Sequence, residues 1–502
     1  MFAHRPLRRK IISYFAKRNA AQVATLTGNA AEAQHRTLLK LIAQARETLF
    51  GSEHGFDAIA GHADFIRRVP LTDYEGMKPY LDRLMAGDRN ILWPGRPVYW
   101  AFTSGTTSGA KHIPIYPGFI KPYSRGGRDA LSRYIAETKN CDCIMGRTLY
   151  FSHDIEYGRI NGIPVSPISG IAYAHIPALF RRRLLPSERV NRMANFEEKI
   201  ALTAKEALGQ NITMVTGIPA WIQMFFNTLN ETTGRSIKEL FPNLSLLVHG
   251  SANIEPYRRN IENALGGKID TLEIYPATEG FFGYQDRQDD KSLLLNLAGE
   301  TYYEFVPADG FDSQEPKRLS LGEVETGVNY AVVISNCTGL WGYLLGDTIR
   351  FTSLAPYRFL ITGRTRHFLS TCGEHIITEE AEWAMAEASQ AFATEVVEFT
   401  VAPGIDKLTG LPLHRWLIEF DDRPPDLDRF ASRLDYLLGV RNINYKEFRE
   451  ANILLRPLVE PIARGGFAGY LKSIGKLGGQ HKMPHLSNDT AISDALSRHK
   501  VP

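Results

Sequence analysis

The segment "AFTSGTTSGAKHIPIYPG" at residues 101–118 gathers residue types that can bind phosphate. Its hydroxyl side chains belong to Thr103, Ser104, Thr106, Thr107 and Ser108. Gly105 and Gly109 would let backbone amides approach an anion closely, and Lys111 adds a positive charge. The spacing is not that of the Walker phosphate loop, G-x-x-x-x-G-K-[ST]. From these residues alone, a phosphate cradle and a plain polar turn both remain open.

Charged side chains also occur beside strand-like runs. Glu279 in "EIYPATEG" could hold Mg²⁺, a helix N-cap or a surface salt bridge being the alternatives. Asp347 in "GLWGYLLGDTIRF" could bind a ribose diol or occupy a turn. Arg364 in "LITGRTRHF" could contact the same ribose or brace a domain junction. Lys482 in "GGQHKMPHL" could be a functional cation or merely a solvated lysine.

The elements that would position these residues alternate along the chain. Residues 1–85 are expected to be mostly helical, with a helix that ends at Gly51. Beyond Pro94 the expected strands are 147–152, 212–217, 244–250 and 271–280, and the expected helices are 189–209 and 254–267. This alternation predicts an α/β sheet with helical crossovers. Ligands of such sheets bind beyond the carboxyl ends of the strands, where the polar turns fall.

The second half of the chain changes character. Strand-like runs dominate residues 302–362, and a smaller α/β pattern follows. Its expected elements are a helix at 378–391, strands at 395–402 and 413–420, and a helix at 425–439. Since 502 residues exceed what one hydrophobic core usually holds, we expect an N-terminal domain at 1–363 and a C-terminal domain at 364–502.

Composition excludes several classes of protein. The net charge of +3 argues against a nucleic-acid partner, and Arg181-Arg182-Arg183 is interpreted as a solvated surface. Four cysteines do not make a disulfide framework. No apolar run reaches the roughly 18 residues that span a bilayer, so no membrane partner is expected. The basic start, "MFAHRPLRRKIISYFAKRNA", is expected to form an amphipathic helix, with a transit peptide as the alternative. These features predict a cytoplasmic protein.

The order of the motifs is more specific than any one of them. T-S-G-T-T-S-G-x-K, Y-x-A-T-E-G, G-L-x-x-Y-x-L-G-D, a Gly-Arg pair and a late Q-x-K-x-P together resemble the adenylate-forming enzymes. "TSGTTSGAKHIP" and "QHKMP" resemble more closely the acyl-acid amido synthetases of the plant auxin-responsive family and their bacterial relatives. The resemblance covers about residues 95–486. It implies a large N-terminal domain of α/β sheets with a β-barrel-like part and a smaller, mobile C-terminal α/β domain.

The resemblance also implies ATP and Mg²⁺ as cofactors and a role for each motif. Residues 103–109 would cradle the β- and γ-phosphates, Glu279 would carry Mg²⁺, and Lys482 would reach the α-phosphate. Tyr275 would stack near the adenine, and residues 216–222 would help to wall the acyl pocket. The other implied binding positions are Lys111 and Thr278, Gly250, Ser251 and Ala252 beside the adenylate, and Asp347 and Arg364 at the ribose.

The implied reaction joins a small carboxylic acid to ATP and passes the acyl-adenylate to an amino acid or amine, which forms an amide. No oligomeric state is predicted. Two alternatives remain: an acyl-CoA ligase, and a nucleotide-binding protein that has lost catalysis. The second is motivated by the expected hinge, where Thr365-Arg366-His367 stands in place of the acidic residues usual in the superfamily.

Overall fold

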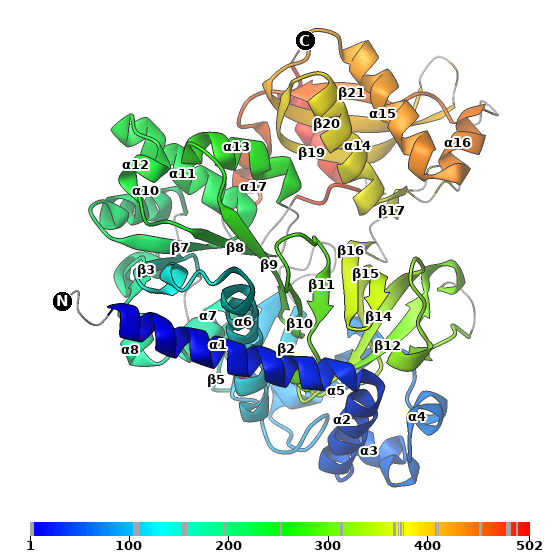
Figure 1. Cartoon of the computed structure of the whole chain (residues 1–502). Helices are drawn as coiled ribbons and strands as arrows, with labels where there is room; N and C mark the ends of the chain where they lie inside the picture. Colours follow the sequence, from blue (N-terminus) through cyan, green and yellow to red (C-terminus); the bar gives the residue numbers. More distant parts are fainter. Residues whose placement is uncertain are drawn as a thin grey trace. The chain divides into compact units, whose positions relative to one another are not determined.

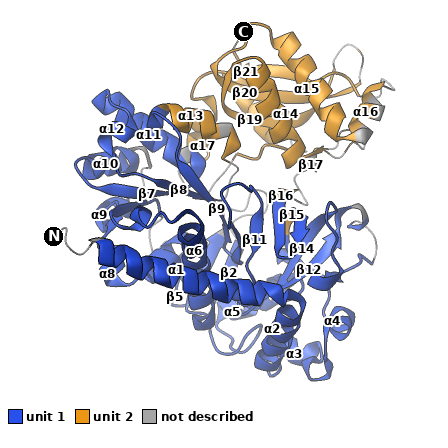
Figure 2. Cartoon of the chain, in the orientation of Figure 1, with its two compact units in different colours: residues 1–252, 264–345, 349–360 blue, residues 253–263, 346–348, 361–502 orange. Residues whose placement is uncertain are grey.

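The computed structural model divides the chain into two compact units (Figures 1 and 2). Unit 1 comprises residues 1–252, 264–345 and 349–360, and unit 2 comprises 253–263, 346–348 and 361–502. The residues that the structure describes are 5–103, 111–152, 158–193, 196–250, 254–311, 315–364, 368–369, 371, 374, 376–406, 409, 411–450, 454–477, 483–487 and 490–501. The functional domains 1–363 and 364–502 stay a prediction.

Helices open unit 1, as the sequence predicts. They are α1 (Arg5–Gly28), α2 (Ala30–Ala45), α3 (Leu49–Glu53), α4 (His62–Arg68) and α5 (Tyr74–Ala86). The expected helix end at Gly51 is wrong, since α2 ends at Ala45 and Gly51 lies inside α3. A Cβ on Gly51 would lie 2.3 Å from the carbonyl oxygen of Ala45. The glycine therefore lets α3 pack closely against the end of α2.

A large mixed sheet forms the framework of the chain. Among the described residues its strand order is β13-β12-β14-β15-β16-β11-β10-β9-β8-β7-β3-β6. Its strands are β3 (Arg147–Tyr150), β6 (Leu184–Leu185), β7 (Ile212–Gly217), β8 (Leu246–Gly250), β9 (Asp270–Ala277), β10 (Gly280–Gln285), β11 (Leu293–Leu295), β12 (Tyr302–Pro307), β13 (Leu319–Ser320), β14 (Asn329–Ser335), β15 (Tyr343–Leu354) and β16 (Tyr357–Arg364). β3, β7, β8 and β9 run parallel, and β10 turns back antiparallel to β9. The expected strands are thereby confirmed.

Helices precede or connect the parallel strands of this sheet. They are α6 (Pro117–Thr138), α7 (Ile168–Ala174), α8 (Ala178–Arg181), α9 (Glu188–Asn191), α10 (Phe196–Ala207), α11 (Pro219–Thr233) and α12 (Ile237–Leu240). The single helix expected at 189–209 is wrong, because a turn at Arg192 separates α9 from α10. Ser187 caps α9 and donates its backbone N–H to Glu206 Oε2 at 2.6 Å. This bond holds α9 beside the end of α10.

A second sheet carries the segment that opens the sequence. Its order is β2-β1-β5-β4. The strands are β1 (Tyr99–Thr103), β2 (Lys111–Ile115), β4 (Gly158–Ile160) and β5 (Ile163–Ser166). β1 and β2 are antiparallel, and Thr103 pairs with Lys111 in their register. The sheet therefore holds both ends of the serine- and glycine-rich loop.

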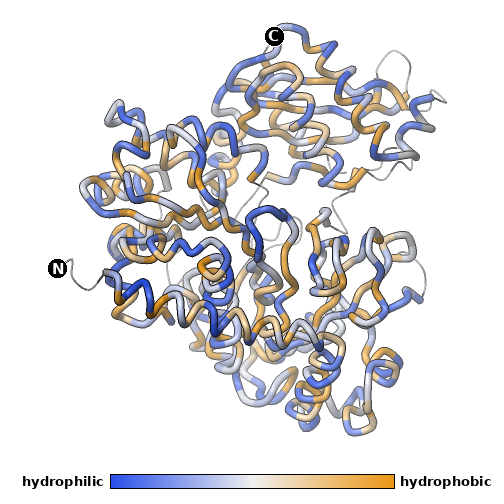
Figure 3. Tube along the Cα trace, viewed as in Figure 1, coloured by the Kyte–Doolittle hydropathy of each residue, from blue (hydrophilic) through white to orange (hydrophobic). Residues whose placement is uncertain are grey.

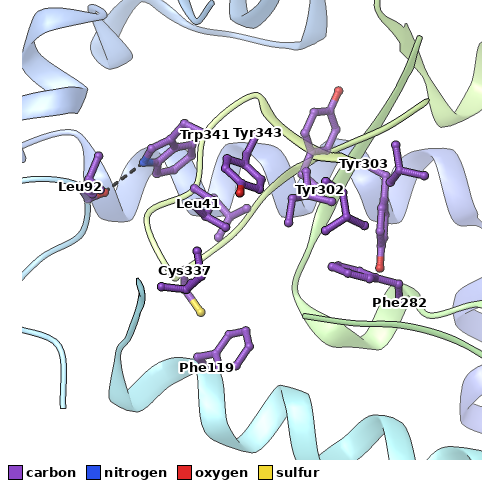
Figure 4. Close-up of a cluster of buried hydrophobic side chains, with 14 of the residues drawn as sticks. Leu41, Leu92, Phe119, Phe282, Tyr302, Tyr303, Cys337, Trp341 and Tyr343 are labelled. Atoms are coloured by element: carbon purple, nitrogen blue, oxygen red, sulfur yellow. Dashed lines mark hydrogen bonds between the residues drawn. The ribbon is translucent and has the colours of Figure 1, made fainter. Parts of the chain in front are cut away.

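Aromatic side chains dominate the core of unit 1 (Figure 4). Trp341 is fully buried and donates its indole N–H to the carbonyl oxygen of Leu92 at 3.0 Å. Tyr302 and Tyr303 lie on β12 in the same cluster. Full burial of side chains of this size stabilises a fold by about 1.5–3 kcal/mol each. The framework under the candidate site is therefore rigidly packed.

Unit 2 is a smaller α/β layer. Its described elements are α13 (Glu255–Leu265, of which 255–263 fall in this unit), β17 (Phe368–Leu369), β18 (Ile376–Ile377), α14 (Thr378–Ala391), β19 (Glu395–Ile405), β20 (Pro412–Asp422), α15 (Leu427–Arg441), α16 (Ile443–Glu450), β21 (Leu458–Ile462), α17 (Gly466–Ser473) and α18 (Ala491–Leu496). β19, β20 and β21 form its sheet, and α14 and α15 share a buried core with it. The helices and strands expected here are confirmed.

Candidate functional site

The carboxyl ends of the parallel strands meet at one edge of the large sheet. Tyr150 ends β3, Gly217 ends β7 and Gly250 ends β8. The register pairs Gly217 with His249 and Gly250 with Ile274. Thr278 and Glu279 follow β9 at the same edge. The structure thus brings together the predicted positions 250, 278 and 279, where α/β sheets bind their ligands.

Gly250 occupies a position that admits no side chain. A Cβ would lie 2.4 Å from the carbonyl oxygen of Ile274 and 3.2 Å from Cδ of Pro276. Both atoms belong to the neighbouring strand β9, whose backbone therefore fixes the requirement for glycine. Ser251 and Ala252, predicted to continue this lining, lie outside the described residues.

Glu279 lies in the two-residue turn that joins β9 to β10. Ala277 and Gly280 flank the turn as register partners. The residue is 8% exposed, and its backbone carbonyl accepts a hydrogen bond of 2.8 Å from Asn336 Nδ2. Since the turn starts no helix and the residue is buried, the helix N-cap and the surface salt bridge considered from the sequence are both wrong.

Asn336 is a supporting residue that the motifs do not reveal. It follows β14. The Oδ1 atom of Asn336 accepts a hydrogen bond of 3.0 Å from the backbone N–H of Thr338 and one of 2.6 Å from the Thr338 hydroxyl. Both side chains are buried. The "NCT" sequence at 336–338 is typical of such a side-chain turn and could have indicated this role. The Glu279 turn is thereby held by neutral hydrogen bonds.

A tyrosine near Glu279, Tyr123, and its neighbour Tyr150 were also missed. Burial first, and then the neighbouring Tyr150 and Glu279, raise the pKa of Tyr123 above its usual value. Burial raises the pKa of Tyr150 to about 12. Both phenols therefore stay neutral near physiological pH and can donate hydrogen bonds. Tyr123 lies on α6 and Tyr150 at the end of β3, so only the tertiary fold unites them.

Lys111 stands where the serine- and glycine-rich loop returns to the sheet. Its ammonium nitrogen lies 5.6 Å from the centre of the Tyr74 ring. The Tyr74 hydroxyl accepts a hydrogen bond of 3.0 Å from the backbone N–H of His112. The loop positions predicted to cradle phosphate, namely Ser104, Gly105, Thr106, Thr107 and Ser108, lie outside the described residues. Tyr74 thus contacts Lys111 at the start of β2, directly after that segment.

Tyr275, expected near the adenine, has its ring in the core. It is 7% exposed, and its ring centre lies 5.3 Å from that of Phe282 in an edge-to-face contact. A second contact joins it to Phe359 at 6.1 Å. Its contact with adenine stays a prediction.

The predicted ribose residues belong to neighbouring strands of the large sheet. Asp347 is half-buried within β15, so the alternative of a turn aspartate is wrong. Gly346 before it has φ of 90°, which glycine adopts without strain. The hydroxyl of Thr362 donates to that of Thr348 at 2.9 Å across β15 and β16. Arg364 ends β16, two residues beyond Thr362; its side chain lies outside the description.

The segment that follows Lys482 contains a histidine, His485, that pairs with two carboxylates. Lys482 and the expected hinge at 365–367 lie outside the described residues. His485, three residues after Lys482, has Nδ1 at 2.8 Å from Glu382 Oε1 and Nε2 at 3.1 Å from Glu398 Oε1. Burial lowers the pKa of His485, but the two carboxylates outweigh it and raise the pKa to about 10. The imidazole is therefore a half-buried cation.

Helix α13 joins the same cluster inside unit 2. The Tyr257 hydroxyl donates a hydrogen bond of 3.2 Å to Glu398 Oε2. Arg259 Nε lies 3.0 Å from Glu395 Oε1 on the same strand, β19. Nothing in the sequence pattern signals these pairs, because their members are more than 130 residues apart.

The donor set fits a magnesium ion better than a metal held by protein alone. Among the described residues, no three His, Cys, Asp or Glu side chains group closely enough to hold a metal ion. Mg²⁺ usually takes one or two protein carboxylates and completes its shell with phosphate oxygens and water. One buried carboxylate at Glu279 agrees with that pattern.

Within the same described part of the chain, no helix has the length and apolar composition to cross a membrane.

Models of one protein family match most of the chain. The GH3 family N-terminal domain matches residues 19–227, the central domain 294–364 and the C-terminal domain 379–491. The fold and the motif order define an adenylate-forming protein. The chain belongs to the GH3 family, which confirms the resemblance inferred from the motifs.

Curated relatives carry the names of amido synthetases. An indole-3-acetic acid-amido synthetase, GH3.3 of Arabidopsis thaliana, is 22% identical over 566 aligned positions, which cover 95% of this chain and 93% of the relative. A jasmonoyl–L-amino acid synthetase, JAR4 of Nicotiana attenuata, is 21% identical over 65% of this chain and 67% of its own length. The prediction of an AMP-forming amido synthetase class agrees with these names.

Solved structures share the fold. The GH3.15 acyl acid amido synthetase superposes with a TM-score of 0.79 at 15% identity, covering 96% of each chain. A 2-hydroxyisobutyryl-CoA ligase in complex with its acyl-adenylate gives a TM-score of 0.58 at 14% identity, covering 98% of this chain and 92% of the ligase. The predicted fold class, with its large N-terminal and smaller C-terminal α/β parts, is confirmed.

Proposed function

We propose that this protein uses ATP to activate a small carboxylic acid as its acyl-adenylate and transfers the acyl group to an amino acid or amine. The observation that carries the proposal is Glu279, a buried carboxylate in the turn at the carboxyl edge of the parallel strands. The names of the relatives support the acid and amino-acid substrate classes. The proposed setting is the cytoplasm.

In the first step the substrate carboxylate attacks the α-phosphorus of ATP, and pyrophosphate leaves. Two anions must meet, so the site has to neutralise negative charge. Residues 103–109 with Lys111 would bind the β- and γ-phosphates, and Glu279 would hold Mg²⁺. When bound, the ion shields phosphate charge and steadies the leaving group. Gly250, with Ser251 and Ala252, would lie along the adenylate.

The neutral tyrosines have a place in this step. Tyr123 lies near both Glu279 and Tyr150, and burial raises the pKa of both phenols, which are neutral at physiological pH. A neutral phenol can donate a hydrogen bond to the substrate carboxylate without adding a further negative charge. The two side chains would therefore orient the acid while Glu279 carries the ion.

In the second step the amine nitrogen attacks the acyl carbon, AMP leaves, and the nitrogen loses a proton. No protein nucleophile is required. Lys482 would contact the α-phosphate during adenylation, and movement of the C-terminal part would then admit the amine. Asp347 and Arg364 would hold the ribose, Tyr275 and Thr278 would flank the nucleotide, and residues 216–222 would border the acyl group.

Acid-dependent exchange of pyrophosphate with ATP tests the first step. We expect exchange with at least one member of a panel of aryl and alkyl acids, and none without acid. Glu279→Gln should reduce exchange by about 100- to 1000-fold, because it removes a charge that acts in the transition state. Glu325→Gln, at an exposed position outside the site, is the matched control. Full exchange in Glu279→Gln would contradict the assignment.

The acceptor is tested on the preformed adenylate. Amino acids, simple amines and coenzyme A are added separately, and mass spectrometry identifies the product. An amide with an amino acid or amine supports the proposal, whereas a thioester alone would make the chain an acyl-CoA ligase. ATP binding without an adenylate from any acid would instead indicate a nucleotide-binding protein without catalysis.

A further inference from the structure

Helix α1 carries large apolar side chains on a side that the described residues leave exposed. Ala16, Ala20 and Val23 face the core, where α1 packs along α6. On the other side the exposed fractions are 56% for Leu7, 47% for Ile11, 61% for Tyr14 and 59% for Phe15. Because a helix turns by about 100° per residue, the spacing i, i+4, i+7, i+8 places these four side chains on one stripe.

Basic side chains flank this stripe. Arg8 lies on one side of it, Lys10 and Lys17 on the other, and all three are exposed. The helix contains no acidic residue. Along α1 hydrophobic and hydrophilic colour alternate from turn to turn (Figure 3). Aromatic and aliphatic side chains between lysines and arginines are typical of helices that lie in the interface of an anionic bilayer.

Helix α8 also combines exposed apolar side chains with neighbouring basic ones. Leu179 and Phe180 are exposed by 72% and 58%, and the three arginines at 181–183 follow them. Asp142 bonds Arg9 of α1 at 3.0 Å, and Arg183 donates to the carbonyl oxygen of Gly146 at 2.6 Å. One short segment, 142–146, therefore ties the start of α1 to the end of α8, which also lie near each other in Figure 1.

Positive charge is crowded where the two helices meet. Burial, and then the neighbouring charge of Arg8, lower the pKa of the Arg183 guanidinium. Like charges at close range repel, and an anion placed between them removes the repulsion. The crowding therefore favours a negatively charged partner.

We infer that this surface, formed by Leu7, Ile11, Tyr14, Phe15, Leu179 and Phe180 with their flanking basic residues, binds the face of an anionic phospholipid bilayer. A bilayer fits because exposed basic side chains stand on both sides of the apolar stripe and α1 has no acidic residue. At an anionic bilayer, lysine and arginine extend to the phosphates while their stems cover apolar surface. The expectation of no membrane partner considered only segments that span a bilayer.

Sedimentation of the full chain with vesicles tests the inference. We expect binding to phosphatidylcholine vesicles that contain about a third phosphatidylserine, weak binding to pure phosphatidylcholine, and release by high salt. Lys10→Glu with Lys17→Glu should weaken binding by about fivefold or more per charge. Lys205→Glu with Lys268→Glu, two exposed lysines elsewhere on unit 1, is the matched control and should bind as the unchanged chain does.

The apolar contribution is tested separately. Tyr14→Ser with Phe15→Ser should abolish most binding, whereas Tyr436→Ser, at a tyrosine of 63% exposure on α15, should not. Circular dichroism of each variant verifies the fold. Equal binding to neutral and anionic vesicles, or none to either, would overturn the inference. So would light scattering that shows a dimer abolished by Tyr14→Ser with Phe15→Ser, since a second copy would then cover the surface. Pyrophosphate exchange by these variants reports on the proposed ligase activity independently.

Discussion

Two parts of the candidate site are held by opposite means. The Glu279 turn joins β9 to β10 in a tight β-hairpin, and its backbone carbonyl accepts a neutral hydrogen bond from Asn336. The segment after Lys482 is fixed by the His485 cation between Glu382 and Glu398. Ionic anchors respond to pH, whereas neutral ones do not. Glu279, which is proposed to stay in place, thus lies in a turn with a neutral hydrogen bond. Lys482, which is proposed to move, precedes a segment that is held by ion pairs.

The largest effect should come from removal of the cation. We expect His485→Gln to lower the stability of unit 2 by about 3 kcal/mol, because two half-buried carboxylates each lose a charged hydrogen-bond partner. Hydrogen exchange of α14 and β19, which carry the two carboxylates, should speed up accordingly. His499→Gln, at an exposed position, is the control. Unchanged protection of both elements would show that the ion pairs do not stabilise the unit.

The pH dependence should differ between the two parts. The pKa of His485 is raised to about 10 in the folded chain, against an ordinary value of 6.5. A raised histidine pKa stabilises the fold fully below pH 6.5, and this contribution is lost as pH rises toward 10. Between pH 6.5 and 10, the free energy that protects the β19 amides from hydrogen exchange should therefore fall by several kcal/mol at most. The protection of β10, beside the Glu279 turn, should change less. His485→Gln should flatten the response of β19.

Substitution of Asn336 should affect the Glu279 turn. Asn336→Ala removes the hydrogen bonds that the side chain makes to the buried carbonyl of Glu279 and to the hydroxyl of Thr338, which costs about 1–3 kcal/mol. Pyrophosphate exchange should drop by about tenfold or more, since the carboxylate is no longer held in position. Asn243→Ala, which removes an exposed hydrogen bond to Asn211, serves as the comparison. Normal exchange in Asn336→Ala would argue that the hairpin alone positions Glu279.

The smallest effect should follow from one hydroxyl. Tyr257→Phe removes the hydrogen bond to Glu398 and keeps the ring, so we expect a loss of about 1 kcal/mol in unit 2. Denaturant unfolding followed by hydrogen exchange of β19 measures it. A loss as large as that of His485→Gln would mean that the tyrosine, not the cation, dominates the cluster.

Local pattern accounted for most of the fold. Apolar runs and their period predicted the strands β7, β8, β9, β12, β14, β15 and β16 but not β10, β11 or β13, and 378–391 agrees with α14 at both ends. Two errors came from tertiary contacts. Gly51 serves close packing rather than a helix end, and the bond from Ser187 to Glu206 helps to divide the helix expected at 189–209. Neither contact is visible to a local pattern.

The site was predictable where a motif lies on one strand and its turn. The places of Glu279 and Gly250 in the fold were predictable because Gly250 ends a recognisable strand and Glu279 follows one closely; their roles stay predictions. Tyr123 and His485 were missed because each acts through partners that only folding brings near. Charge-bearing residues outside motifs give no signal until their neighbours are known.

Helix α13 has a consequence for dissecting the chain. It precedes β9 in sequence, yet residues 253–263 group with unit 2, where Tyr257 and Arg259 bond β19. A fragment that begins at residue 361 would therefore lack the hydrogen bond to Glu398 and the ion pair with Glu395, and would leave an acidic binding surface on β19. A synthetic helix of residues 253–265 should bind to that surface, so the two pieces would complement each other in trans.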